Sequence, residues 1–207
     1  MRTNARTGRP PTERGRRKRG ALVRAAREVF EERGFEDTRI ARITGRAGVA
    51  YGSFYTYFDS KEAVFHEVAK GVAGEMFDAA RSAAPIGAEP VDRIRHSTER
   101  FLAAYRENAR IMQVIEQISP RHPEFRALFL EIRGLFVERI VTGTRRLQEE
   151  GLASTDIDVP TTASMLGGMV EHTARMLFLY GEEHDADVVV ETATRLWARG
   201  IGLDGVP

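Results

Sequence analysis

The 207-residue chain contains no cysteine, a single tryptophan, and three lysines against 28 arginines. Without cysteine it can form neither disulfides nor thiolate metal sites, and it offers no cysteine nucleophile. No segment approaches the roughly 18 consecutive apolar residues that a membrane-spanning helix needs. The basic N-terminus is not followed by the apolar stretch of a secretory signal. We therefore expect a cytoplasmic protein that does not enter the membrane.

The patterns that mark common enzymes are also missing. No zinc-protease HExxH, hydrolase GxSxG, phosphate-binding loop or dinucleotide fingerprint occurs in the chain. The histidines are scattered, at His66, His96, His122, His172 and His184. We expect neither catalysis nor a cofactor, and no metal site.

Charge is distributed unevenly along the chain. Residues 1–61 carry 15 basic and 7 acidic residues, a balance of +8, whereas the remainder carries 16 basic and 23 acidic residues, a balance of −7. A basic first third is typical of a nucleic-acid-binding domain, although charge blocks are also found on ordinary solvated surfaces. We expect a disordered basic arm over residues 1–19, a DNA-binding domain over 20–66 and a separate body over 67–207.

Apolar periodicity of about 3.6 residues, with proline and glycine between the periodic segments, predicts an all-α fold. We find no convincing strand pattern. The expected helices cover about 20–33, 38–46, 50–57, 59 to the low 80s, 91–107, 109–118, 123–150, 161–181 and 186–201.

Residues 38–66 have the pattern of two short helices joined by a tight turn and followed by a capped third helix. Thr38 is a plausible N-cap for the first. Gly48 in the Ala-Gly-Val turn can adopt positive φ at little cost. Phe54 and Phe58 are expected in the core, and Asp59 or Ser60 is expected to cap the third helix. In a helix-turn-helix the second helix enters the major groove of DNA.

The run T-x-I-x-x-I-x-x-x-A-G-V-A-x-G-S-F-Y-x-Y-F-x-S-K-E-A-V resembles the signature of the tetracycline-repressor (TetR) family of bacterial transcriptional regulators. The close match covers residues 20–66. Thr44 departs from the usual alanine, and we interpret it as a packing variation bonded to its own helix. The rest of the chain resembles the family only in its helical outline.

The resemblance implies a set of DNA contacts in the first third of the chain. These residues are Thr38, Arg39, Arg42, Gly48, Tyr51, Gly52, Ser53, Tyr55, Tyr57 and Lys61. The arginine-rich arm adds Arg9, Arg16, Arg17 and Arg19. Arginines on an arm suit a narrow minor groove, and the alternative for the arm is nonspecific attraction to DNA. For Tyr57 core packing is an equal alternative.

The resemblance also implies a homodimer held together by the last two helices. The expected interface residues are Leu166, Gly167, Val170, Thr173, Leu177, Tyr180, Val189, Ala193, Leu196 and Trp197. An alternative interpretation of these stripes is core packing within one chain.

A ligand cavity in the body is a further implication of the resemblance. The candidate wall consists of apolar positions with a few polar members, namely Phe101, Tyr105, Met112, Glu116, Phe129, Arg133, Phe136, Met165, Met169, His172 and Met176. Methionine-rich walls adapt to varied apolar ligands, but methionine stripes are also common in plain cores. The sequence thus predicts a DNA-binding repressor released from operator DNA by a small hydrophobic molecule. The alternative is a regulator without a small-molecule effector.

Overall fold

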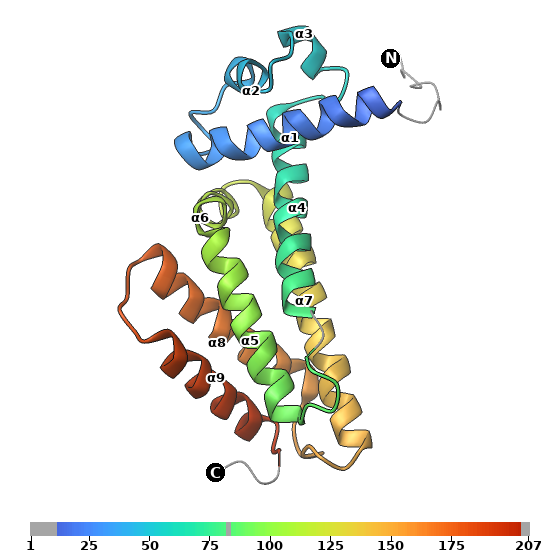
Figure 1. The fold of residues 1–207 in the computed structure, drawn as a ribbon, viewed down its shortest axis with the longest axis vertical. Helices are drawn as coiled ribbons and strands as arrows, with labels where there is room; N and C mark the ends of the chain where they lie inside the picture. The colour runs from blue at the N-terminus through green and yellow to red at the C-terminus, as the bar shows by residue number, and fades with distance from the viewer. Residues whose placement is uncertain (1–11, 82–83, 204–207) are drawn as a thin grey trace. The chain divides into compact units, whose positions relative to one another are not determined.

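The computed structural model describes residues 12–81 and 84–203, and within these ranges the chain forms nine α-helices and no strand (Figure 1). The helices, α1 to α9 in chain order, are Glu13–Arg33, Ile40–Arg46, Tyr51–Phe54, Lys61–Arg81, Pro90–Glu107, Ala109–Ile118, Pro123–Glu149, Val159–Leu179 and Ala186–Gly200. The all-α prediction is confirmed. None of the helices described is both long and apolar enough to cross a membrane.

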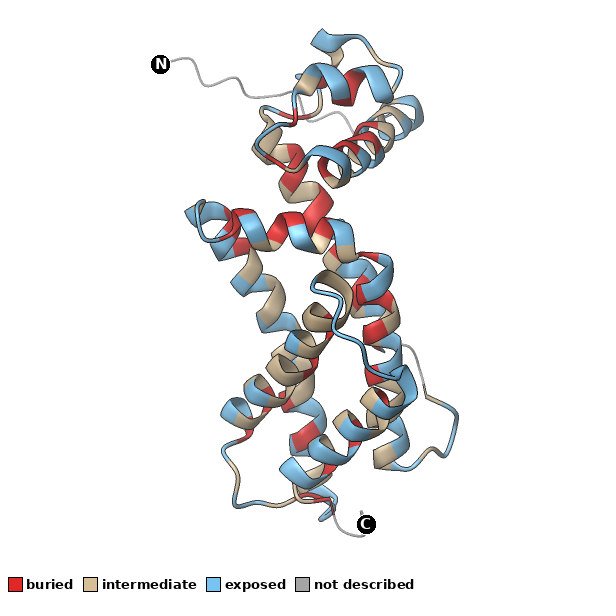
Figure 2. Cartoon of the chain, turned by 90° about the vertical axis from the view of Figure 1, so that its left-hand side faces the viewer, coloured by how far each residue is buried: buried red, intermediate tan, exposed pale blue. Residues whose placement is uncertain are grey.

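The chain divides into two compact units, Met1–Val68 and Ala69–Pro207. The first contains α1 to α3 and the first two turns of α4. The second contains the rest of α4 and α5 to α9. In Figure 2 buried residues alternate with exposed ones along the helices of both units, as amphipathic helices around separate cores require.

Aromatic side chains fill the core of the first unit. The ring of Phe65 meets Phe30 and Phe35 edge-on, each at a centroid distance of 5.0 Å. Ile43 of α2 and Phe54 of α3 are fully buried, and each contributes roughly 1.5–3 kcal/mol by leaving water. Phe58 is also buried, which confirms the prediction for both phenylalanines.

Helix α1 begins at Glu13 rather than near Gly20, so residues 13–19, which were predicted to be part of a disordered arm, are helical. Thr12 caps the helix: its hydroxyl accepts a hydrogen bond from the Gly15 amide at 3.2 Å. Glu13 lies in the first turn and pairs with Arg17 one turn later. A cap and an i,i+4 ion pair therefore extend a segment that has no apolar face of its own. The predicted DNA contact Arg9 lies outside the described residues.

The second unit is built from longer helices whose ends follow local signals. Pro123 and Pro160 lie in the first turns of α7 and α8, where a missing amide hydrogen costs nothing. Asp158 caps α8 through the Thr161 amide at 3.0 Å, and Asp185 caps α9 through the amides of Asp187 and Val188. These caps place α8 and α9 close to their predicted positions.

Candidate DNA-binding surface and ligand cavity

The turn between α2 and α3 has the geometry that the sequence predicts. Gly48 adopts φ +66°, a conformation that residues with a Cβ rarely take. The Val49 amide donates to the Thr44 carbonyl at 3.0 Å, and the Thr44 hydroxyl donates to the Ala41 carbonyl at 3.1 Å. Thr44 is buried and bonded to its own helix, as expected.

Helix α3 and its C-cap residue present two tyrosines to solvent. Tyr51 is 53% exposed and Tyr55 is 45% exposed, and their hydroxyls lie 3.2 Å apart. Gly52 between them is exposed, and a Cβ there would meet no heavy atom within 4 Å. This small, open surface can approach a groove of DNA closely. Tyr57, for which packing was the alternative, is half-buried.

Helix α3 is only four residues long, whereas the sequence predicted a helix to Tyr57. Beyond Phe54 the amides of Thr56 and Tyr57 donate to carbonyls three residues back, at Ser53 and Phe54. The chain therefore tightens into turns. These turns bring Phe58 into the core beside Phe54, with ring centroids 5.7 Å apart.

The exposed arginines of α2 fall into two classes. Arg39 and Arg42 are exposed, and within residues 12–81 and 84–203 neither takes part in an ion pair. Arg46 instead forms a two-pronged pair with Glu32, both distances being 2.8 Å, and also contacts Glu28 at 3.2 Å. Arg46 thus ties α2 to α1, and no sequence motif indicated this contact.

Besides Arg17, which pairs with Glu13, three predicted DNA contacts have partners inside the first unit. Thr38 is buried, and its hydroxyl donates to the Gly34 carbonyl at 2.6 Å. It neither caps α2, whose N-cap is Arg39 without a side-chain bond, nor reaches the surface, so the prediction for Thr38 was wrong. The free carbonyls at the end of α1 attract its hydroxyl instead.

Lys61 and Arg19 are the other two. The Lys61 ammonium donates to the carbonyls of Phe35 at 2.8 Å and Glu36 at 3.2 Å. Arg19 pairs with Glu67, and its guanidinium carbon lies 5.0 Å from the centre of the Phe58 ring. Both cations therefore hold the first unit together, and their contacts with phosphate stay predictions.

A cavity of about 510 Å³ lies within the second unit, between α4, α5, α6, α7, α8 and α9. This volume is within the range of ligand pockets in proteins, roughly 300–1,000 Å³. Six predicted residues are part of its wall: Phe101, Tyr105, Met112, Phe129, Arg133 and Phe136. The sole tryptophan, Trp197, also lines it.

The predicted methionine face of α8 is not part of this wall. The lining residues of α8 are Gly167, Val170 and Glu171. Met165 is 70% exposed and His172 is exposed, and neither they nor Met169 and Met176 line the cavity. The prediction chose the wrong side of a helix that is apolar on two sides, because periodicity does not show which side faces inward.

Two polar networks flank the apolar wall. The Tyr105 hydroxyl donates to Glu116 at 3.0 Å, and Arg175 lies 3.5 Å from the other oxygen of that carboxylate. Glu116 is therefore a partner of the wall residue Tyr105 rather than part of the wall. Burial and the neighbouring carboxylates raise the pKa of Tyr105, so the phenol stays neutral and donates.

The second network pairs Arg133 of α7 with Glu171 of α8. Arg133 also donates to the Ser164 carbonyl at 3.0 Å. Burial raises the pKa of Glu171, and the attraction of Arg133 opposes that shift. The pair leaves this part of the wall electrically balanced.

The predicted dimer stripes separate into inward and outward residues. Gly167, Val170 and Trp197 line the cavity, and Leu166 packs against the cluster of Ala198 and Ile201. Val170 is buried within one chain, whereas Leu166, Gly167 and Trp197 are half-buried. The surface members include Tyr180, 73% exposed, and Leu196, 51% exposed. Thr173, Leu177, Val189 and Ala193 are half-buried as well, and the dimer interface stays a prediction.

Residues 22–68 match the family model of the bacterial regulatory proteins of the tetR family. The chain is 25% identical to the HTH-type transcriptional regulator YdgC of Bacillus subtilis over 182 residues, covering 86% of this chain and 90% of that protein. It is 25% identical to the HTH-type transcriptional regulator EthR of Mycolicibacterium smegmatis, covering 92% of each.

The fold is also found in solved structures. A TetR-like transcriptional regulator from Rhodococcus sp. RHA1 superposes with a TM-score of 0.68 at 23% identity, covering 88% of this chain and 94% of that one. At this identity the match concerns the fold alone. The relatives by sequence are described as transcriptional regulators, in agreement with a helix-turn-helix whose second helix is exposed.

Proposed function

We propose that this chain, which belongs to the tetR family of bacterial regulatory proteins, is a cytoplasmic repressor that leaves its operator DNA when a small, mainly apolar molecule occupies the second unit. The observation that carries the proposal is the cavity of about 510 Å³ with its aromatic wall. A packed protein interior keeps few voids larger than a water molecule. A cavity of this size with few polar groups is therefore suited to a ligand.

DNA contact is proposed for the exposed face of the helix-turn-helix. Tyr51, Gly52 and Tyr55 would face the major groove, with Ser53 and Tyr57 beside them. Arg39 and Arg42 are available for phosphates, because no carboxylate among the described residues pairs with them. Arg16 and Arg17 on the first turns of α1 would add contacts that weaken as salt rises.

A homodimer is proposed through the outward faces of α8 and α9. Besides Tyr180 and Leu196, this surface includes Met165 and Val188, which is 60% exposed. Exposed apolar groups on two adjacent helices favour a partner of the same kind. A dimer would also present two copies of α3 to half-sites about 34–36 Å apart.

Coupling between ligand and DNA is proposed to pass through α4. This helix contributes residues to both units, and its Val72 and Met76 line the cavity. A ligand shifts the DNA-binding equilibrium only if it binds the DNA-free conformation more tightly. The alternative, a regulator without an effector, predicts a closely packed body, and the cavity argues against it.

The test begins with an operator selected from a random DNA library by the purified protein. Lipophilic compounds are then titrated into the protein–operator complex, and release is followed by fluorescence anisotropy. Ligand-dependent loss of affinity, with a fixed stoichiometry of two chains per operator, is the expected result. Failure of every compound that binds the cavity to change operator affinity would favour the regulator without an effector.

A further inference from the structure

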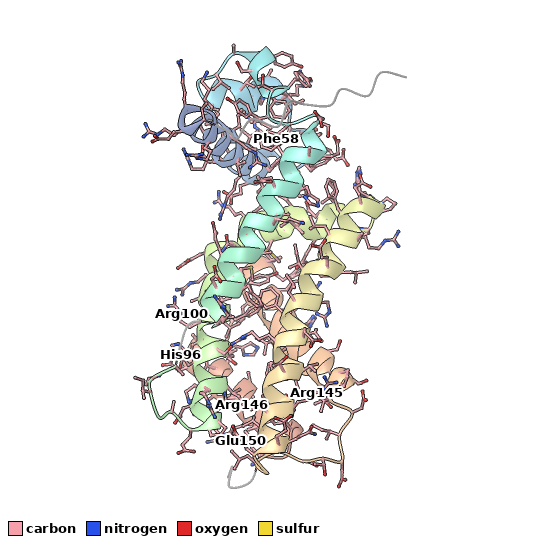
Figure 3. All side chains as sticks on the ribbon, turned by 90° about the vertical axis from the view of Figure 1, so that its right-hand side faces the viewer. Phe58, His96, Arg100, Arg145, Arg146 and Glu150 are labelled. Carbon is pink, nitrogen blue, oxygen red and sulfur yellow. The ribbon has the colours of Figure 1, made fainter. Side chains whose placement is uncertain are left out.

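The charged residues in the cavity wall do not balance. Four arginines and two glutamates line the cavity, which gives the wall a net charge of +2. Arg133 pairs with Glu171, and Arg146 pairs with Glu150 at the C-terminal end of α7 (Figure 3). The two remaining cations are Arg93 and Arg139. Within residues 12–81 and 84–203, neither forms an ion pair.

Arg139 is the more significant of the two because it is half-buried, whereas Arg93 is exposed to solvent. Its guanidinium donates to the Ala80 carbonyl at 2.6 Å and to the Ser97 hydroxyl at 3.2 Å. The Ser97 hydroxyl itself donates to the Ala80 carbonyl at 3.0 Å. Arg139 is thus fixed in place by neutral oxygens.

Neutral partners do not compensate a buried charge fully. Burial and the nearby Arg81 lower the pKa of Arg139, which reflects the cost of a cation with no carboxylate beside it. The carbonyl of Ala80 belongs to the last turn of α4 and carries part of the negative end of the helix dipole. An oxyanion with a full charge would be a better partner for the guanidinium.

The rest of the wall near Arg139 is apolar. Phe136 and Ile140 lie on the same helix within one turn of Arg139, and all three line the cavity. Phe136 packs edge-on against Phe101 at a centroid distance of 5.9 Å. The cavity therefore combines one half-buried cation that has no carboxylate partner among the described residues with an aromatic and aliphatic body, a pattern that fits an amphipathic molecule.

We infer that the ligand is an amphipathic anion, with a carboxylate or phosphate head on Arg139 and an apolar body against Phe101 and Phe136. This inference rests on the proposed function, since it names the chemistry of the proposed effector. The fork of N–H donors on a guanidinium matches both head groups. An anion at this position would also compete with the Ala80 carbonyl for Arg139, and so would act directly on the end of α4.

Binding can be measured without DNA, because Trp197 is the only tryptophan and lines the cavity. Its fluorescence would be titrated with four ligands of equal chain length: decanoate, decyl phosphate, methyl decanoate and decylamine. We expect decanoate or decyl phosphate to bind at least about tenfold more tightly than the neutral ester, as one charge-assisted contact allows. The amine should bind most weakly. Comparison of decanoate with decyl phosphate identifies the head group.

The residue is tested with Arg139→Gln, using Arg145→Gln as the matched control. Arg145 lies on the same helix, is exposed and is not part of the cavity wall (Figure 3). Arg139→Gln should remove the preference for the anion over the ester, and the ester should still bind, which shows that the cavity is folded. Arg139→Lys keeps the charge and should retain part of the preference. Arg145→Gln should behave as the wild type.

Two outcomes would overturn the inference. One is a wild-type protein that binds methyl decanoate or decylamine as tightly as the anions, a result that needs no variant. The other is an anion preference that survives in Arg139→Gln. Operator release separates this inference from the proposed function. Arg139-dependent binding of decanoate without release of DNA would refute the effector mechanism alone. Equal release by the ester and the anion would refute the anion site alone.

Discussion

The sharpest prediction concerns the two exposed hydroxyls of α3, which Tyr51→Phe and Tyr55→Phe remove one at a time. In the free protein the hydroxyls contact each other at 3.2 Å, and about half of each side chain is open to solvent. The hydrogen bond with Tyr51 raises the pKa of Tyr55. A phenol is protonated at neutral pH even at its ordinary pKa of about 10, so either hydroxyl can donate to DNA. The rings, which also contact each other at a centroid distance of 5.8 Å, are retained in both variants.

The expected size of the effect follows from these contacts. Loss of one exposed hydroxyl should change the free energy of unfolding by less than about 0.5 kcal/mol, as is usual for surface substitutions. In the complex with operator, each hydroxyl that bonds a phosphate or base contributes about 0.5–1.5 kcal/mol, which corresponds to a roughly twofold to tenfold rise in Kd. Because the hydroxyls bond each other, the double variant should depart from additivity.

Operator affinity would be measured by fluorescence anisotropy at one fixed salt concentration, with a scrambled duplex as the reference. Thr161→Val is the control for loss of an exposed hydroxyl, since Thr161 is exposed, lies in the second unit and belongs to neither the cavity wall nor the proposed dimer interface. Thermal unfolding of each variant checks that stability is unchanged. If both α3 variants bind operator with the wild-type Kd, the hydroxyls do not contact DNA and the proposed face of α3 is wrong.

Three further predictions concern other positions. Lys61→Met should lower the free energy of unfolding by about 1–2 kcal/mol, because two carbonyls lose a charged donor. Unchanged stability would contradict this. If the salt dependence of operator binding also falls by about 0.9 in slope, Lys61 contacts a phosphate as well. Gly202→Ala should lower the free energy of unfolding, measured by urea denaturation, by about 2 kcal/mol or more. Gly202 has φ +66°, and an alanine Cβ there would lie 2.7 Å from the nearest side-chain atom. Gly181 has φ +74° but open space around the position of a Cβ, so Gly181→Ala should lower the free energy of unfolding by only about 1 kcal/mol. Equal losses of stability in Gly181→Ala and Gly202→Ala would show that the close contact at Gly202 has no effect. Met165→Glu and Leu196→Glu should give monomers in sedimentation velocity, and intact dimers would reject the proposed interface.

Features that depend on neighbouring residues in the chain were predictable. The Gly48 turn has the φ that its sequence requires, and Ser60 caps α4 through the Ala63 amide at 3.2 Å. Pro123 and Pro160 mark the starts of their helices within a few residues. The predicted cap failed at Thr38, where the hydroxyl donates to the Gly34 carbonyl instead of accepting from an amide of α2.

Contacts between helices were not predictable in the same way. Six of the predicted residues line the cavity. On α8 the methionine face was predicted to line the cavity, but the face of Val170 lines it instead. The sequence could not distinguish them, since both faces are apolar. Arg139 carried no signal at all, because nothing in its local sequence shows that the Ala80 carbonyl lies beside it.

The sequence by itself thus determined the helices, most of their ends and the helix-turn-helix, because hydrogen bonds, caps and turn conformations act over a few residues. Only the tertiary structure decided which side of α8 faces the cavity, that Lys61 binds the carbonyls of Phe35 and Glu36, and that Arg139 has no carboxylate partner among the described residues. These outcomes depend on groups far apart in the chain. Their distances are set by how whole helices pack, and the pattern of one helix contains no record of its neighbours.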